Sequence, residues 1–130
     1  MCIGRPFTVA GAPRLAPKVA REDWSRGDLP RCEGLDDRAR RALADAWEAD
    51  ARAEHASVAS FARTSLVWIG LGAPPELLAA AHEAAIDEVR HARLSFRIAS
   101  AFAGEGRGPG PLPLADMAPA DLSPVDAALE

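Results

Sequence analysis

Tyrosine is absent from this 130-residue chain, and aromatic residues make up only 5 % of it. The two cysteines, Cys2 and Cys32, do not form a CxxC pair, which argues against a zinc site built on them, and nothing in the sequence demands a disulfide between them. No apolar run approaches the ~18 residues of a membrane span, and residues 1–15 lack the apolar core of a signal peptide. We therefore expect a soluble, cytoplasmic protein that spans no membrane.

A basic surface is also missing. The net charge is -4 and the isoelectric point is near 5.4, so we expect no nucleic-acid partner. Hydrophobic residues make up 48 % and charged residues 26 %, proportions typical of a globular domain. Alanine dominates the central region and favours helices. The length and composition together predict one small helical domain.

Residues 1–34 are rich in proline and carry only one candidate strand, at residues 5–9. We interpret this segment as an extended N-terminal arm that lies against the helices through Phe7 and Trp24. The alternative is a terminus with no fixed position.

The first predicted helix begins near Asp36 or Asp37, either of which can cap it, and contains no proline or glycine before Gly70. At 1.5 Å per residue it would be roughly 50 Å long. One stripe recurs at spacings of three and four, and we predict that it faces the core. The stripe consists of Leu43, Trp47, Ala51, Glu54, Val58, Phe61, Ser65 and Trp68.

The sequence GLGAPP, at residues 70–75, breaks this helix and starts a second one, which we place at about residues 75–103. Its predicted stripe includes Glu88 and His91, and we expect Phe102 in the core. Residues 104–122 read as a Pro/Gly-rich loop, and residues 123–130 as the start of a third helix, with Ser123 as its cap. The fold class is therefore all-α, with a long antiparallel helical hairpin over residues 35–103.

Three ligand-type side chains lie in these two stripes. Glu54 is about fifteen residues before the turn, and Glu88 and His91 are about thirteen and sixteen residues after it. In an antiparallel hairpin these positions are level. Buried carboxylates are costly unless they are paired or bind a cation, and carboxylates with an imidazole suit iron, manganese or zinc. We therefore predict that Glu54, Glu88 and His91 bind metal.

The alternative for Glu88 and His91 is an exposed helix face with no role in metal binding. The core stripe of the second helix would then be the readable series Leu78, Ala81, Ala85, Ala92 and Phe96. Of the other histidines, we place His55 at the helix boundary or next to the ligands, and His82 on the surface.

Glu54, followed by EVRH at residues 88–91, resembles the ferritin-like di-iron carboxylate superfamily. The longer strings DEVRHA, at residues 87–92, and EHASVASF, at residues 54–61, are similar to the ligand-bearing helices of that superfamily. The resemblance implies half of a four-helix bundle, with Glu54 as a terminal ligand, Glu88 as a bridging ligand and His91 as a terminal nitrogen ligand. It also implies that Asp87 hydrogen-bonds a ligand histidine of the opposing pair, and that Arg90 lies in a supporting ion pair.

The chain carries only half of such a site, because no histidine follows His91. Either a homodimer supplies the second half, or the chain is a truncated fragment of a longer one, cut as its third helix begins. The resemblance implies iron, with manganese as an alternative, and redox chemistry with dioxygen or peroxide, as in a di-iron oxidoreductase. The competing hypothesis is a non-catalytic helical module for oligomerisation or docking that binds no metal.

Overall fold

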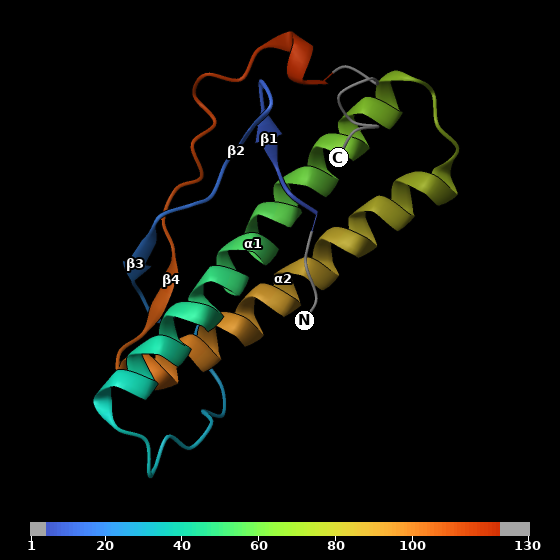
Figure 1. The fold of residues 1–130 in the computed structure, drawn as a ribbon. Coiled ribbons are helices and arrows are strands. Elements are labelled where there is room, and N and C mark those ends of the chain that lie inside the picture. The colour runs from blue at the N-terminus through green and yellow to red at the C-terminus, as the bar shows by residue number, and fades with distance from the viewer. Residues whose placement is uncertain (1–4, 123–130) are drawn as a thin grey trace.

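The computed structural model describes residues 5–122, and two long helices dominate it (Figure 1). Helix α1 spans Asp37–Gly70 and helix α2 spans Pro75–Ala103. They pack side by side in opposite directions over their length, and this confirms the predicted helical hairpin. The predicted start of a third helix at Ser123 lies outside the described residues.

The ends of both helices follow from local chemistry. The Asp36 side chain caps α1 by accepting a hydrogen bond from the Ala39 amide at 2.7 Å. Pro75 is the first residue of α2, where its missing N–H costs no helical hydrogen bond. Gly104 ends α2 with a φ of 78°, a left-handed conformation that glycine adopts without strain.

Four short strands flank the hairpin. Strand β1 (Thr8–Val9) pairs antiparallel with β2 (Ala12–Pro13), and β3 (Lys18–Ala20) pairs antiparallel with β4 (Arg107–Pro109). A short 3-10 helix, η1, covers Pro119–Leu122. The candidate strand at residues 5–9 contains β1, whereas β2 and β3 in the arm, and β4 and η1 in the predicted Pro/Gly-rich loop, were not predicted. The β3–β4 pair joins segments far apart in the chain, which no local sequence pattern reveals.

The N-terminal arm lies against the helices, as predicted. Phe7 and Val9 are each 2 % exposed and form a small core with Ala56 of α1. Trp24 packs against a second core of Ala51, Ala92 and Phe96, all completely buried. Each of these two cores joins the arm to α1.

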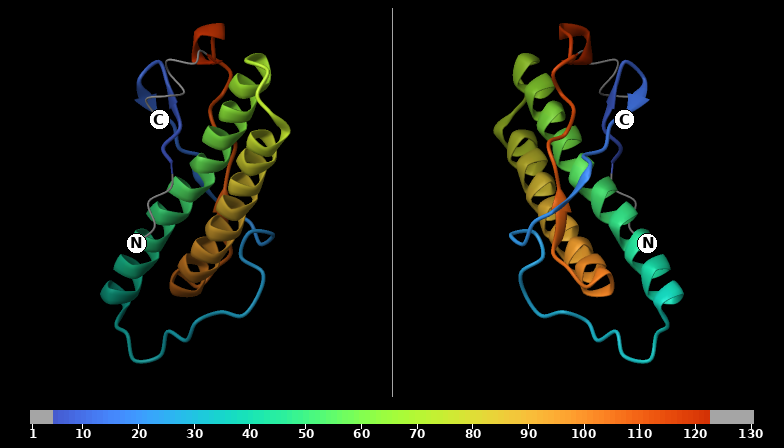
Figure 2. Two further views of the ribbon diagram at one scale, coloured as in Figure 1. Left: turned by 90° about the vertical axis from the view of Figure 1, so that its right-hand side faces the viewer. Right: turned by 90° about the vertical axis from the view of Figure 1, so that its left-hand side faces the viewer.

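The returning C-terminal segment is tied to the arm. Asp121 accepts hydrogen bonds from the Ala10 amide at 3.2 Å and from the Ala118 amide at 2.6 Å. Strands β3 and β4 and the segment up to η1 lie across one face of the hairpin. On the opposite face none of the described strands crosses the helices (Figure 2), although the start of the arm reaches α1, where the Arg5 guanidinium lies 5.5 Å from the centre of the Phe61 ring. We call this second face the open face.

The predicted core aromatic residues are only half-buried, which corrects the sequence interpretation. Trp47, Phe61, Trp68 and Phe102 are all of intermediate exposure, and Leu43 is 36 % exposed. Apart from Phe96, the completely buried residues of the two helices are alanines and serines, because small side chains let the two backbones approach closely. In the part of the chain that is described, no helix is both long and apolar enough to cross a membrane.

Candidate metal centre

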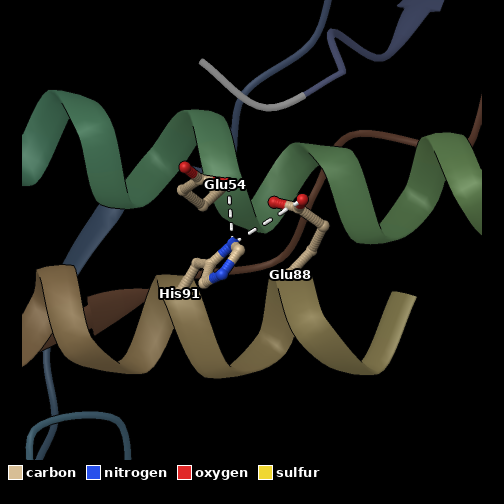
Figure 3. A group of neighbouring side chains, drawn as sticks. All are labelled: Glu54, Glu88 and His91. Atoms are coloured by element: carbon tan, nitrogen blue, oxygen red, sulfur yellow. Dashed lines mark ion pairs between the residues drawn. The ribbon is translucent and has the colours of Figure 1, made fainter. Parts of the chain in front are cut away.

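Glu54 from α1 and Glu88 and His91 from α2 converge at one height of the hairpin (Figure 3). The Nδ1 atom of His91 lies 3.7 Å from Glu88 Oε1 and 3.9 Å from Glu54 Oε2. One ligand atom from each of the three residues lies within 4.8 Å of the other two. The prediction that these three residues lie at the same height between the two helices is therefore confirmed.

The local sequence explains this convergence. Glu88 and His91 are three residues apart and share one face of α2. Ala51, three residues before Glu54, and Ala92, directly after His91, are both completely buried. The absence of larger side chains at these positions brings the two helices close enough for ligands on both to meet.

The two carboxylates are buried and the imidazole is not. Glu54 is 3 % exposed and Glu88 is 9 % exposed, whereas the His91 side chain is 47 % exposed. The alternative of a solvent-facing Glu88 is therefore wrong, although His91 does lie partly open. The Oε2 atoms of both glutamates are buried, and neither has a hydrogen-bond partner among residues 5–122. Buried oxygens of this kind are costly unless they bind a cation or hold a proton.

The pKa of Glu54 reflects the cost of burying two carboxylates together. Burial and the adjacent Glu88 carboxylate raise the pKa of Glu54 to about 8, and the negative charge of Asp50 adds to the effect. Without a cation, Glu54 therefore holds its proton near neutral pH. A divalent cation would replace that proton and remove the repulsion between the two carboxylates.

Two of the three distances between the side chains are compatible with ligands on one ion. Metal–oxygen and metal–nitrogen bonds of about 2.0–2.2 Å, as zinc makes them, place two ligands on one ion at most about 4.4 Å apart. Both distances from His91 Nδ1 fall inside this limit. Carboxylate and imidazole are also a donor set that iron, manganese and zinc accept.

A cavity of about 460 Å³ lies beside the cluster on the open face. Its walls are mainly apolar, and Glu54 and His91 reach it from the two helices. The other lining residues are Ala46, Trp47, Asp50, Leu94 and Ser95. Sequence reasoning missed Asp50, although its position one helical turn before Glu54 was a readable signal.

Of the residues that the resemblance placed around the ligands, Arg90 lies in an ion pair, as implied, and its partner is Asp87. Arg90 pairs with Asp87 at 2.8 Å, on the exposed side of the same helix. His55 lies on the other side of α1, with its ring edge-on to Trp24 at a centroid distance of 5.5 Å. Burial and the positive charge of Arg21 lower the pKa of His55. Because its ring lies against Trp24, His55 is not part of the group formed by Glu54, Glu88 and His91.

His82 is exposed, as predicted, and its Nε2 atom lies 2.9 Å from the Ser65 hydroxyl. This contact links the two helices nearer to the turn than the metal-ligand candidates.

No protein-family model, curated protein or solved structure matches the chain. The ferritin-like resemblance therefore depends on the residues of this cluster and on the hairpin that carries them.

Proposed function

We propose that this chain is a ferritin-like metal-binding protein in which Glu54, Glu88 and His91 form half of a carboxylate-bridged di-iron site. Manganese is the alternative metal. The observation that carries the proposal is the pair of buried carboxylates, each with a buried oxygen that accepts no hydrogen bond from the described residues, beside an imidazole nitrogen less than 4 Å away. A purely structural role leaves these carboxylates with no compensation beyond a proton on Glu54 and the contacts with His91.

Each residue has a distinct task in this proposal. Glu54 would hold one metal from α1, Glu88 would be the ligand shared between the two metals, and His91 would be the nitrogen ligand. Bound ferrous iron would supply electrons to dioxygen or peroxide. The apolar surroundings of the cluster keep the carboxylates poorly hydrated, which strengthens their attraction for a cation. Glu54 must release its proton before it can bind.

A complete di-iron site needs a second set of ligands. The described residues contain one such group, and its His91 side chain is 47 % exposed. A second hairpin must therefore pack over the cluster, supplied by another copy or by further sequence.

The second candidate function is a docking or oligomerisation module without metal. The exposed apolar side chains near the cluster, such as Leu94 at 46 % exposure, favour it. The two functions predict different effects of removing the Glu88 charge. A docking module should gain stability, whereas a metal-binding protein should lose a metal ligand.

Native mass spectrometry after anaerobic loading with ferrous iron tests the proposal. Wild type should retain iron, and Glu88→Ala should lose it while keeping its helical circular dichroism. Glu83→Ala, an exposed position on the same helix, is the matched control and should behave as wild type. Equal iron retention by Glu88→Ala would refute the assignment of Glu88 as a ligand.

A further inference from the structure

We propose that the cavity beside the metal-ligand candidates binds a small organic cation, with the Asp50 carboxylate as its counter-ion. The ligand class is a primary ammonium group on an apolar body, as in an arylalkylamine. As the substrate class of the metal centre, this inference rests on the proposed function, whereas the binding itself can be measured with and without metal.

The walls of this cavity are mainly apolar and contain no lysine or arginine. Its volume is about 460 Å³, and Ala46, Trp47 and Leu94 contribute apolar surface to it. A cavity of this size accommodates a small molecule, and its charged groups select the charge of the ligand. Three other cavities in the described part of the chain each have an arginine in their walls, namely Arg63, Arg26 and Arg52. Of these four cavities, the one beside the metal-ligand candidates is therefore the one suited to a cation.

Asp50 is a carboxylate without a counter-ion in this cavity. It is half-buried, and none of residues 5–122 forms an ion pair or a hydrogen bond with its side chain. Glu54, which is 3 % exposed, reaches the same cavity, and its buried Oε2 accepts no hydrogen bond from the described residues. Carboxylates in an apolar wall favour a cationic ligand, because the low local polarity strengthens the attraction. Ser95 of α2 adds a hydroxyl acceptor for an ammonium N–H.

The register of the hairpin orders these groups along the cavity. Glu54 and His91 meet at one height, so Asp50, one turn before Glu54, lies at about the height of Leu94. Trp47 lies almost one further turn from the metal-ligand candidates. An ammonium bound to Asp50 therefore keeps its nitrogen nearer to those ligands and extends its apolar body toward Trp47. The indole adds attraction for a cation through its π face.

Three probes with the same body and different charges test the inference: 2-phenylethylammonium, 2-phenylethanol and phenylacetate. Isothermal calorimetry measures their binding to the full chain at pH 7, in EDTA and with saturating Mn²⁺. The ammonium should bind about tenfold more tightly than the alcohol, as expected for one charge-assisted hydrogen bond, and the anion more weakly than either. In NMR spectra, bound Mn²⁺ should broaden the signals of the methylene protons next to nitrogen more than those of the ring.

Matched variants locate the charge and the cavity. Asp50→Asn preserves shape, so it should lower the affinity for the ammonium by about tenfold and leave that for the alcohol unchanged. Asp45→Asn is the control, because Asp45 is exposed on the same helix, about 140° around from Asp50. It should bind all three probes as wild type does. Trp47→Leu should weaken the binding of the ammonium and the alcohol together, and circular dichroism establishes that each variant is folded.

Several results would overturn the inference. One is that the ammonium binds undetectably or no more tightly than the alcohol, and another is that Asp50→Asn binds it as wild type does. An ammonium that binds only in EDTA and is displaced by Mn²⁺ would occupy the metal position instead of the cavity. A chain that retains Mn²⁺ without preferring the ammonium would refute this inference alone. A chain that prefers the ammonium through Asp50 but binds no Mn²⁺ would support the cation site and refute the proposed function.

Discussion

His91 Nδ1 on α2 lies 3.9 Å from Glu54 Oε2 on α1, and the next residue, Ala92, is completely buried in the contact between the helices. The ligand geometry and the helix packing are therefore adjacent features of one contact. A change in the register of α1 against α2 would displace both. The predictions below separate the chemistry of the cluster from the packing that holds it.

Glu54→Gln tests whether the buried charge is kept for metal binding. The substitution preserves shape and removes the charge, so the metal-free chain should become more stable at pH 9, by about 1 kcal/mol or more. Its affinity for Mn²⁺ should fall by more than about 100-fold, beyond the effect expected of a residue that only supports a ligand. Urea unfolding and isothermal calorimetry measure the two effects. Glu76→Gln, at an exposed position of α2, should change neither. A Glu54→Gln variant that is less stable and binds Mn²⁺ normally would contradict the proposed role.

The raised pKa of Glu54 predicts how stability depends on pH. The folded chain binds a proton at Glu54 up to about pH 8, whereas an ordinary glutamate releases it near 4.5. Between these values the folded state holds more protons than the unfolded state, so the metal-free stability contributed by Glu54 falls as pH rises. Urea unfolding in a chelator across this range should show the loss, and Glu54→Gln should show less of it. A loss of the same size in the variant would assign the pH dependence to other groups.

Metal binding should show the complementary dependence. Because the ion displaces the Glu54 proton, the apparent affinity for Mn²⁺ should rise by up to about tenfold per pH unit below pH 8. Calorimetry in buffers of different ionisation enthalpy would measure the proton released. Binding without proton release at pH 7 would argue that the ion does not contact this carboxylate.

Trp24→Ala tests the anchoring of the arm. The indole packs against Phe96 at a centroid distance of 6.0 Å, on the side of the hairpin away from the cavity. Its loss should destabilise the chain by about 2 kcal/mol, less than for a fully buried tryptophan. Trp24→Phe should lose less. Mn²⁺ affinity should change far less than in Glu54→Gln, and a comparable loss would show that the arm positions the ligands.

Gly106→Ala tests the pairing of the arm with the returning segment. A Cβ at Gly106 would lie 2.7 Å from the carbonyl oxygen of Arg21, whose amide donates to the Gly106 carbonyl. The backbone must shift, so we expect a loss of about 1–3 kcal/mol in thermal or urea unfolding. Gly70→Ala is the control, because a Cβ there meets no atom within 4 Å and alanine favours a helix. It should be neutral or slightly stabilising, and an equal loss in both variants would contradict this account.

Local sequence was sufficient for the helices. Asp36, the Gly70–Pro75 break and Gly104 act within one or two turns, so the bounds of α1 and α2 could be predicted closely. That Glu54, Glu88 and His91 lie at the same height along the hairpin followed from the same bounds, because an α-helix has a fixed rise per residue. Their metal binding stays a prediction.

Only the tertiary structure decided the rest. The pairing of β3 with β4, and the Trp24 contact with Phe96, join segments more than seventy residues apart, and no periodicity signals such contacts. The burial of Glu88 beside a half-open His91 depends on how the helices cross. The sequence alone predicted which side chains would share a height, because that depends on helical geometry. Which of them lose water was decided by the packing of α1 on α2, and which face the strands cover was decided by the pairing of β3 with β4.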